Sequence, residues 1–324
     1  MKEAKVKTLL VGTSEYASKV FENLLKFPEL EVVGIITQPD KPFGRKKENL
    51  APPVKKLFEN TDIKIYQPVK FKAEYQDILD ETKPELVIVC AYGKILPEGF
   101  LNYPKFKCIN IHGSVLPKYR GATPVQTTIL NGDDEAGITL QVMSKELDEG
   151  DIIASTCIGL NTKSITVPLL FEMLVEPTVS LLRETLHKYL SGMIVPTKQS
   201  SSHVSYCYIS DFTFEKGEIS FKRHAAKVDQ FIRAFNPEPG SWVRDMVVGD
   251  KKFEGITKII EGRVYDGDIF INEINIKPGD YFVHYKRLLV KCLDYFYEIQ
   301  KIQPANKNVM LAADFINGLN SKKK

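Results

Sequence analysis

The sequence predicts an α/β protein in which an open, mostly parallel sheet is followed by a small β-barrel. Three observations lead to this prediction. Short apolar runs alternate with helical patterns through the first 160 residues, a stretch rich in Ser, Thr and Pro follows, and several strand-like runs come last. At 324 residues the chain is long enough for two domains with separate cores.

The first part of the chain has the alternation that βαβ units require. Its apolar runs are short and rich in β-branched residues, and such runs between helices are typical of parallel strands covered on both faces. Gly12 ends the first run without the further glycines of a GxGxxG motif, so this turn does not indicate dinucleotide binding. The expected strands are 8–12, 31–38, 63–67, 85–92 and 108–112, and the expected helices are 15–27, 53–60 and 72–81.

The middle of the chain predicts a hairpin and a long helix. Two extended runs, 136–144 and 151–160, flank the turn LDEG, and a helical pattern over 165–191 closes the first domain. The residues after it lack helical period and have the composition of a linker. The expected boundaries are an N-terminal domain over 1–191, a linker over 192–211 and a C-terminal domain over 212–324.

The last part of the chain predicts the barrel. A short helix over 225–235 ends at an Asn-Pro pair, and regularly spaced strand-like runs follow it. One helical pattern, 309–319, precedes the terminal SKKK. The expected strands are 241–248, 251–260, 281–292 and 295–302.

The overall composition is that of an ordinary globular protein, with 43% hydrophobic and 26% charged residues. No segment approaches 18 uninterrupted apolar residues, so we expect no membrane span. The apolar run near the N-terminus is short, so we do not expect a signal peptide. The five cysteines are scattered and form no CxxC pair, which indicates reduced thiols in a cytoplasmic protein, without a metal site. The net charge of +3 is small, and the mildly basic C-terminal part suits either a polyanion or a solvated tail.

An unusual strand, CINIHGS (108–114), carries polar residues at every second position. Alternate residues of a strand share a face, so Asn110, His112 and Ser114 line one side while Ile109 and Ile111 pack on the other. Parallel α/β sheets bind ligands at the carboxyl ends of their strands, which is where these polar groups are expected. A single histidine there is more often a hydrogen-bonded core residue, but an amide beside it favours a functional site.

Asp148, in the turn LDEGD, could reach His112 from the neighbouring hairpin and favour the charged form of its ring. The Asn110 amide could donate to an oxygen that gains negative charge. A set of Asn, His and Asp without a Ser or Cys nucleophile indicates direct acyl transfer, in which an amine attacks a carbonyl without a covalent enzyme intermediate. Ser114 lacks the GxSxG elbow, so we assign it to ligand binding or to the turn.

These residues carry a resemblance. NIHGSVLP followed downstream by LDEGD is similar to the signature of formyltransferases that use 10-formyltetrahydrofolate, and further motifs resemble the branch that acts on methionyl-tRNA. The resemblance covers nearly the whole chain because the motifs recur in order across both domains. The segment 192–211 departs from it, since it is longer and more polar than we expect. The further motifs are TQPDKPFGRKK (37–47), AYGKILP (91–97), YRGATPVQ (119–126) and IRAFNPEPG (232–240).

The resemblance implies a Rossmann-like formyltransferase fold with an OB-like C-terminal barrel, no metal, and 10-formyltetrahydrofolate as formyl donor. It also implies that initiator methionyl-tRNA accepts the formyl group, that the barrel holds the tRNA backbone, and that the protein is a monomer. The implied catalytic residues are Asn110, His112 and Asp148. The implied folate contacts are Ser114, Val115, Leu116 and Pro117, with Val115 in place of a Leu, and the backbone of Ala91, Tyr92, Gly93 and Ile95 beside the pterin.

Arg45, Lys46 and Lys47 would match the family's insertion that contacts the tRNA acceptor end. A basic triplet is ordinarily a solvated turn, but this one lies at the carboxyl edge of the expected sheet, which favours nucleic acid and salt-dependent binding. Two other functions remain open. The acceptor could be an amino sugar or water, in which case activity would not depend on tRNA, or the chain could bind tRNA without catalysis, against which the intact trio argues.

Overall fold

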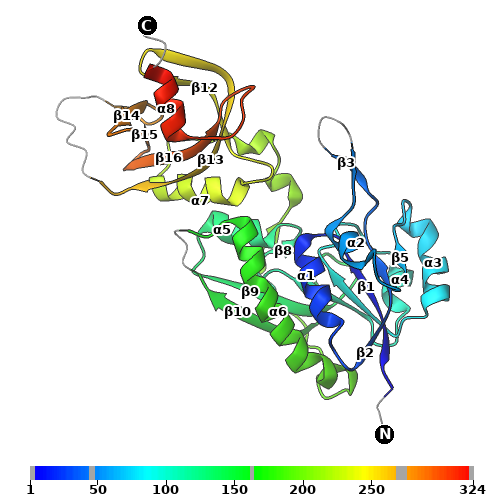
Figure 1. The fold of residues 1–324 in the computed structure, drawn as a ribbon. Coiled ribbons are helices and arrows are strands. Elements are labelled where there is room, and N and C mark those ends of the chain that lie inside the picture. Colours follow the sequence, from blue (N-terminus) through cyan, green and yellow to red (C-terminus); the bar gives the residue numbers. More distant parts are fainter. Residues whose placement is uncertain (1–3, 44–47, 161–163, 268–275, 321–324) are drawn as a thin grey trace. The chain divides into compact units, whose positions relative to one another are not determined.

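The computed structural model describes residues 4–43, 48–160, 164–267 and 276–320. The chain divides into two compact units, drawn in Figure 1. The N-terminal unit comprises Met1–Val125, Glu135–Leu160 and Leu169–Cys207, and the C-terminal unit comprises Gln126–Asp134, Asn161–Pro168 and Tyr208–Lys324. The expected linker therefore lies partly inside the N-terminal unit.

A seven-stranded sheet forms the centre of the N-terminal unit. Five strands run parallel, and an antiparallel hairpin extends the sheet at one edge, in the order β10-β9-β7-β6-β1-β2-β5. The predicted open, mostly parallel sheet is confirmed. Its strands are β1 (Val6–Gly12), β2 (Leu30–Ile36), β5 (Ile65–Tyr66), β6 (Leu86–Cys90), β7 (Cys108–His112), β9 (Glu135–Val142) and β10 (Ile152–Gly159).

Helices cover both faces of this sheet. On one face Leu9, Val11 and Val89 pack in a buried cluster with residues of α3 and α4, such as Leu79 and Phe100. On the other face α1 contacts α6 through a hydrogen bond between Tyr16 and Thr178. The helices are α1 (Glu15–Leu24), α2 (Pro53–Phe58), α3 (Phe71–Thr82), α4 (Glu98–Asn102) and α6 (Val167–Leu190), and α5 (Pro124–Asn131) is shared between the two units.

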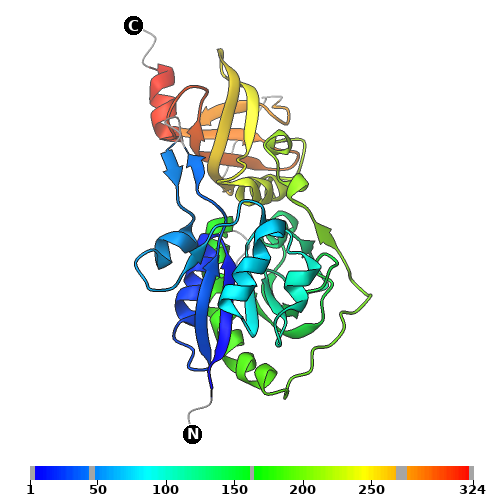
Figure 2. The same cartoon turned by 90° about the vertical axis from the view of Figure 1, so that its right-hand side faces the viewer.

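After α6 the chain does not leave the N-terminal unit at once. It runs in extended form along the outside of this unit, as the yellow-green trace in Figure 2 shows, and ends in β11 (Tyr206–Cys207). There β11 pairs in parallel with β8 (Arg120–Gly121), a short strand that follows the turn after β7. A second small pair of strands, β3 (Lys41–Phe43) and β4 (Glu48–Leu50), is antiparallel and lies between β2 and α2 in the sequence.

The C-terminal unit contains the predicted β-barrel, which is closed and has five strands. Closure follows because β13 pairs with β12 on one side and with β16 on the other. Its elements are 3-10 turns at Ile209–Asp211 and Glu215–Gly217, α7 (Ala225–Phe235), β12 (Trp242–Val248), β13 (Lys251–Tyr265), β14 (Tyr281–His284), β15 (Arg287–Lys291), β16 (Phe296–Gln303), β17 (Met310–Leu311) and α8 (Ala312–Asn320).

One expected strand, 281–292, is two strands in the structure. Tyr285 and Lys286 both have positive φ, 44° and 63°, and they form a two-residue turn that joins β14 to β15. Two consecutive left-handed residues match the twist of a hairpin, although Asn-Gly is the usual sequence for such a turn.

No helix among the described residues is long and apolar enough to cross a membrane.

Candidate active site

The strand β7 carries the two polar residues that the sequence singled out. It lies between β6 and β9, where Asn110 is opposite Gln141 and His112 is opposite Thr139. Ile109 is almost fully buried and alternates with Asn110, which is half-buried, while the His112 side chain is only 5% exposed. The period of two thus places Asn110 and His112 on one side of the strand end, as predicted.

Ser114 stabilises the turn that follows β7. Its hydroxyl donates to the Lys118 carbonyl, and its own carbonyl accepts a hydrogen bond of 2.7 Å from the Thr139 hydroxyl. Thr139 Oγ1 in turn accepts from the Leu116 backbone N–H at 3.0 Å. Leu116 is buried, whereas Val115 is 41% exposed. Of the two roles left open for Ser114, the turn is the one for which the structure gives contacts.

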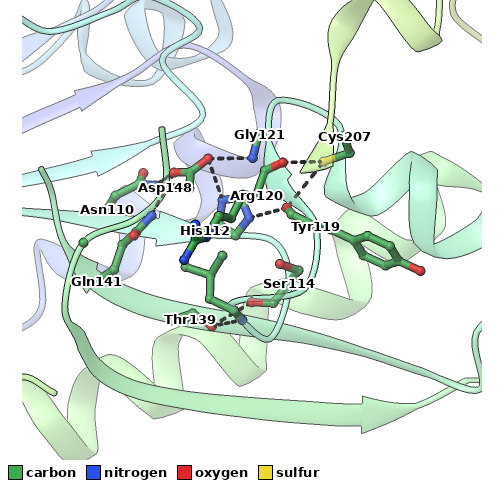
Figure 3. Close-up of polar contacts among 12 residues, drawn as sticks. Asn110, His112, Ser114, Tyr119, Arg120, Gly121, Thr139, Gln141, Asp148 and Cys207 are labelled. Atoms are coloured by element: carbon green, nitrogen blue, oxygen red, sulfur yellow. Dashed lines mark hydrogen bonds and ion pairs between the residues drawn. The ribbon is translucent and has the colours of Figure 1, made fainter. Parts of the chain in front are cut away.

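Asp148 joins Asn110 and His112 at the end of β7, as Figure 3 shows. Its Oδ1 accepts hydrogen bonds from Gln141 Nε2 at 2.8 Å and from Asn110 Nδ2 at 3.3 Å. Its Oδ2 accepts from the Gly121 backbone N–H at 2.8 Å and lies 3.6 Å from His112 Nδ1. Side-chain and main-chain donors therefore surround the carboxylate, in a side chain that is 13% exposed.

Both ring nitrogens of His112 face oxygen atoms. Nε2 lies 2.9 Å from the Tyr119 carbonyl, and Nδ1 faces the Asp148 carboxylate. A carbonyl oxygen can only accept, so Nε2 carries a proton in this arrangement. Nδ1 lies 3.6 Å from Asp148 Oδ2, so the carboxylate is beside the imidazole, as the sequence suggested.

Two glycines, Gly121 and Gly150, allow the backbone around the trio to lie in close contact with neighbouring strands. Gly121 has φ +116°, and a Cβ there would lie 2.1 Å from the Cys207 carbonyl oxygen on β11. Gly150, in the turn that contains Asp148, packs on the end of β9, where a Cβ would lie 1.7 Å from the Val142 carbonyl oxygen. Only glycine fits at either position, so neither turn could adopt this conformation with a side chain.

Sequence reasoning did not identify several groups that hold the trio. The Gln141 side chain, the Gly121 N–H and the Tyr119 carbonyl contact it directly, and Gln199 binds the backbone of Asp148. Gln141 had a signal, because it is a polar residue near the end of β9, in a stretch that is otherwise almost fully buried. The backbone groups of Tyr119 and Gly121 left no signal in the sequence, since any residue type has a carbonyl and almost any has an N–H.

The segment after β6 presents backbone at the carboxyl edge of the sheet. Ala91 and Gly93 have positive φ, 46° and 73°, and both are exposed, as is Ile95 at 95%. The Tyr92 carbonyl is already occupied, since Thr13 Oγ1 donates to it at 3.2 Å and Gln38 Nε2 at 2.6 Å. The Tyr92 side chain is buried, and this burial, with a smaller contribution from Glu74, raises the pKa of its hydroxyl to about 12.

Comparison with known proteins identifies the family. Residues 4–165 match the family described as Formyl transferase, and residues 212–320 match the one described as Formyl transferase, C-terminal domain. The chain belongs to the formyl transferase family. It is therefore an enzyme, and the resemblance drawn from the sequence motifs is confirmed.

Relatives within the formyl transferase family match almost end to end. A Limosilactobacillus fermentum protein named Methionyl-tRNA formyltransferase is 33% identical over 313 residues, which are 96% of this chain and 94% of the relative. A protein of the same name from Caldanaerobacter subterraneus is 33% identical over 317 residues, which are 97% of each chain.

Solved structures share the fold at lower identity. HypX from Aquifex aeolicus, in complex with tetrahydrofolic acid, has a TM-score of 0.66 at 15% identity. The match covers 98% of this chain and 48% of the HypX chain. An N-formyltransferase from Helicobacter canadensis, in complex with folinic acid and dTDP-3-aminofucose, has a TM-score of 0.64 at 20% identity, covering 91% of this chain and 98% of that one. At these identities the likeness shows the fold alone.

Two further expectations concern the surroundings of the site. Arg45, Lys46 and Lys47 lie outside the described residues. Among the residues that the structure describes, no three His, Cys, Asp or Glu side chains come together as metal ligands would.

Proposed function

We propose that the protein transfers the formyl group of 10-formyltetrahydrofolate to the α-amino group of methionine on initiator methionyl-tRNA. The observation that carries this proposal is the cluster of Asn110, His112 and Asp148 at the carboxyl end of β7. Two relatives that match over almost their whole length and are named Methionyl-tRNA formyltransferase support the choice of acceptor.

The reaction is a direct acyl transfer. The neutral amino nitrogen attacks the formyl carbon, the new C–N bond forms, and the bond from that carbon to the folate nitrogen breaks. The amine loses a proton and the folate nitrogen gains one, so no oxidant or covalent enzyme intermediate is required. An α-amino group has a pKa of about 7.7 in model peptides, and esterification lowers this pKa, so a large fraction of the amine is the neutral nucleophile at neutral pH.

Asn110 stabilises the oxyanion that forms during attack. Its Nδ2 carries two hydrogens, and the 3.3 Å contact with Asp148 engages one of them. The other can donate to the oxygen of the formyl group as negative charge develops there. Because one such donor contributes roughly 3 kcal/mol to transition-state stabilisation in comparable sites, Asn110 would account for a large part of catalysis.

His112 and Asp148 move the proton and balance the charge. A charged imidazole stabilises the oxyanion, and Asp148 fixes its orientation. In the structure the ring donates to the Tyr119 carbonyl, so contact with substrate requires that the ring give up this hydrogen bond while it keeps Asp148. Catalytic hydrogen bonds commonly tighten only when substrate is bound.

The formyl donor would bind along two segments at the same sheet edge. The backbone of 91–95, in which Ala91, Gly93 and Ile95 are exposed, would offer polar groups to the pterin, except the carbonyl of Tyr92, which two side chains already engage. The turn with Ser114, Val115, Leu116 and Pro117 lies directly after β7 and exposes Val115 as an apolar contact. An apolar contact beside backbone polar groups is what a flat heterocycle with an amide edge would require.

The tRNA that carries the acceptor amine would be held by the C-terminal barrel and by the basic side chains of the insertion, Arg45, Lys46 and Lys47. Phosphate contacts of this kind make binding weaker as salt is added. An amino-sugar acceptor is the alternative, because the Helicobacter canadensis neighbour was solved with dTDP-3-aminofucose, although the 20% identity gives it less support.

The deciding experiment supplies the purified protein with 10-formyltetrahydrofolate and one acceptor at a time: initiator Met-tRNA, elongator Met-tRNA, and a nucleotide-linked amino sugar. We expect formylmethionine on the initiator tRNA, at a rate that falls as salt is raised. Formylation of the amino sugar alone would reject the tRNA as acceptor, and release of formate without either product would indicate a hydrolase.

A further inference from the structure

The extended segment over residues 199–207, here called the arm, lies against the backbone that holds the catalytic trio. It belongs to the N-terminal unit and ends in β11. Arg120 donates its backbone N–H to the Ser205 carbonyl at 2.8 Å, and Ala122 donates to the Cys207 carbonyl at 3.0 Å. Ser205 Oγ also accepts from the Tyr119 N–H at 2.9 Å.

The backbone that the arm fixes is the backbone that contacts the trio. The Tyr119 carbonyl faces His112, and the Gly121 N–H faces Asp148. These two groups flank Arg120, so a single peptide stretch, paired with β11, sets the positions of both side chains. Figure 3 shows Cys207 on the other side of this stretch, with its thiol directed at the carbonyls of Tyr119 and Arg120.

Gln199, at the start of the arm, binds the turn of Asp148 itself. Its Nε2 donates to the Asp148 carbonyl at 2.7 Å and to the Gly150 carbonyl at 2.9 Å. Its Oε1 accepts from Arg120 Nε at 3.0 Å. The one amide side chain therefore uses both of its hydrogens and its oxygen to join the turn at 148–150 to β8.

Arg120 completes the connection. Arg120 is 7% exposed. Its guanidinium pairs with Glu149 Oε1 at 2.8 Å and donates to the Tyr206 hydroxyl at 3.1 Å. Tyr206 in turn donates to Glu149 Oε1 at 2.7 Å. All of these side-chain contacts of Arg120 run to the arm or to the turn that contains Asp148.

We propose that the arm is part of the active site, with Gln199 as a positioning residue that holds the backbone of Asp148. This inference rests on the catalytic role proposed for Asp148. Asp148 has φ +52°, a conformation that is unfavourable for a residue with a side chain and persists only when its surroundings fix it. Gln199 supplies part of that constraint, because its amide donates to the carbonyls of Asp148 and Gly150.

The test compares Gln199→Ala with Lys198→Ala, a substitution of the exposed residue that directly precedes the arm. We expect kcat of Gln199→Ala to fall by about tenfold or more, because small displacements of a catalytic group have large effects on rate. KM for the formyl donor and for the acceptor should stay within about threefold, since neither is bound by Gln199. Tyr206→Phe, which keeps the ring but loses the hydroxyl contacts, should give a smaller loss of kcat.

A second readout does not depend on activity. The Gly121 amide hydrogen is bound to Asp148, so its exchange with solvent, followed by NMR, reports on the position of the carboxylate. It should exchange at least about tenfold faster in Gln199→Ala than in the wild type or in Lys198→Ala. If the wild type fails to formylate Met-tRNA, the proposed function is rejected while this comparison still decides the role of the arm.

Two outcomes would overturn the inference. In the first, kcat and Gly121 exchange in Gln199→Ala match the Lys198→Ala control. In the second, kcat falls only together with a higher KM for both substrates and faster exchange throughout the N-terminal unit, which is what a general loss of stability produces.

Discussion

The backbone N–H of Gly121 donates a 2.8 Å hydrogen bond to Oδ2 of Asp148, across 27 residues of sequence. The carboxylate of the site is thus held by main chain as well as by the side chains of Asn110 and Gln141. Main-chain donors are fixed by secondary structure and lose no rotamer freedom, so they position a charged group with little entropic cost. The pairing of β8 with β11 gives Gly121 that rigidity.

Gly121→Ala should disrupt the site from a position without a functional side chain. The added Cβ would lie 2.1 Å from the Cys207 carbonyl oxygen, and the φ of +116° is strained for any other residue. We expect the free energy of unfolding to fall by roughly 1–3 kcal/mol from strain alone, and kcat to fall more than stability explains. Denaturant unfolding and steady-state kinetics measure the two effects.

Gly159→Ala is the matched control for this substitution. Gly159 lies in β10, its φ is not in the left-handed region, and a Cβ there would meet nothing within 4 Å. It should leave both stability and kcat nearly unchanged. Equal losses in the two variants would show that the close approach of Gly121 to β11 is unimportant.

Asp148→Asn should reduce kcat by at least about 100-fold, the lower range for loss of an acid–base group. The amide removes the charge opposite His112. It also turns an NH₂ group towards one of the donors that now bind the carboxylate, either Gln141 Nε2 or the Gly121 N–H. Rapid-quench measurement of the transfer step separates this effect from product release, and the dissociation constant for the formyl donor should change little.

Glu146→Gln provides the comparison, since Glu146 is an exposed carboxylate of the same turn. Its kcat should stay within about twofold of the wild type. Similar losses from both substitutions would mean that the charge of the turn, and not the position of Asp148, supports the reaction.

The parts of the site that could be predicted are those with a periodic or motif signal. Asn110 and His112 follow from the period of a strand, and Asp148 from its place in a turn beside an imidazole. The contacts of Gln199 with the backbone of Asp148 span 51 residues, and its segment reads as a polar linker. A side chain that binds backbone carbonyls leaves no pattern in sequence, because the carbonyls belong to every residue type.

The fold, like the site, has parts that a sequence pattern predicts and parts that it does not. The central strands β1, β6 and β7 are largely buried apolar runs, which is the strongest pattern available to a parallel strand. The hairpin at Tyr285 and Lys286 was not predictable, since neither residue favours positive φ. Pairing of β14 with β15 and closure of the barrel decide the conformation of that turn, and these are tertiary effects.

The helix α7 is capped by a residue that is distant in sequence. Asp294 Oδ1 accepts from the Ala225 N–H at 2.8 Å, and Oδ2 lies 3.0 Å from His224 Nδ1. Partial burial alone would raise the pKa of Asp294, but hydrogen bonds from Ala225, Tyr295 and His224 lower it to about 2. The charged carboxylate is therefore favoured in the folded state.

Asp294→Asn keeps one side-chain oxygen but removes the negative charge, so it should destabilise the C-terminal unit by about 1 kcal/mol at neutral pH, the upper range for a charge at a helix N-terminus. Since the folded pKa lies below that of the unfolded chain, the contribution is fully present above about pH 4 and is lost as the pH falls towards 2. The two proteins should thus converge in stability at low pH. Urea unfolding from pH 7 to 3 measures this, with Asp250→Asn, an exposed carboxylate, as control; a pH-independent difference would refute the capping role.

A buried ion pair on α7 gives the last prediction. Asp229 Oδ2 and Arg233 Nε are 2.7 Å apart, their side chains are 9% and 10% exposed, and Arg233 Nη1 also donates to the Ile165 carbonyl at 2.7 Å. Burial raises the pKa of Asp229 even though Arg233 acts in the opposite direction. The carboxylate therefore depends on its partner to remain charged.

Arg233→Met should lower the free energy of unfolding of the C-terminal unit by about 3–5 kcal/mol, because it leaves a buried charge without its partner. Adding Asp229→Asn should recover part of this loss. The deficit of the single variant should also shrink as the pH falls, since protonated Asp229 carries no charge. Lys301→Met, which breaks an exposed pair with Glu261, should cost less than about 1 kcal/mol. Equal costs for the buried and exposed pairs, measured by urea unfolding, would show that burial does not set the strength of the Asp229–Arg233 pair.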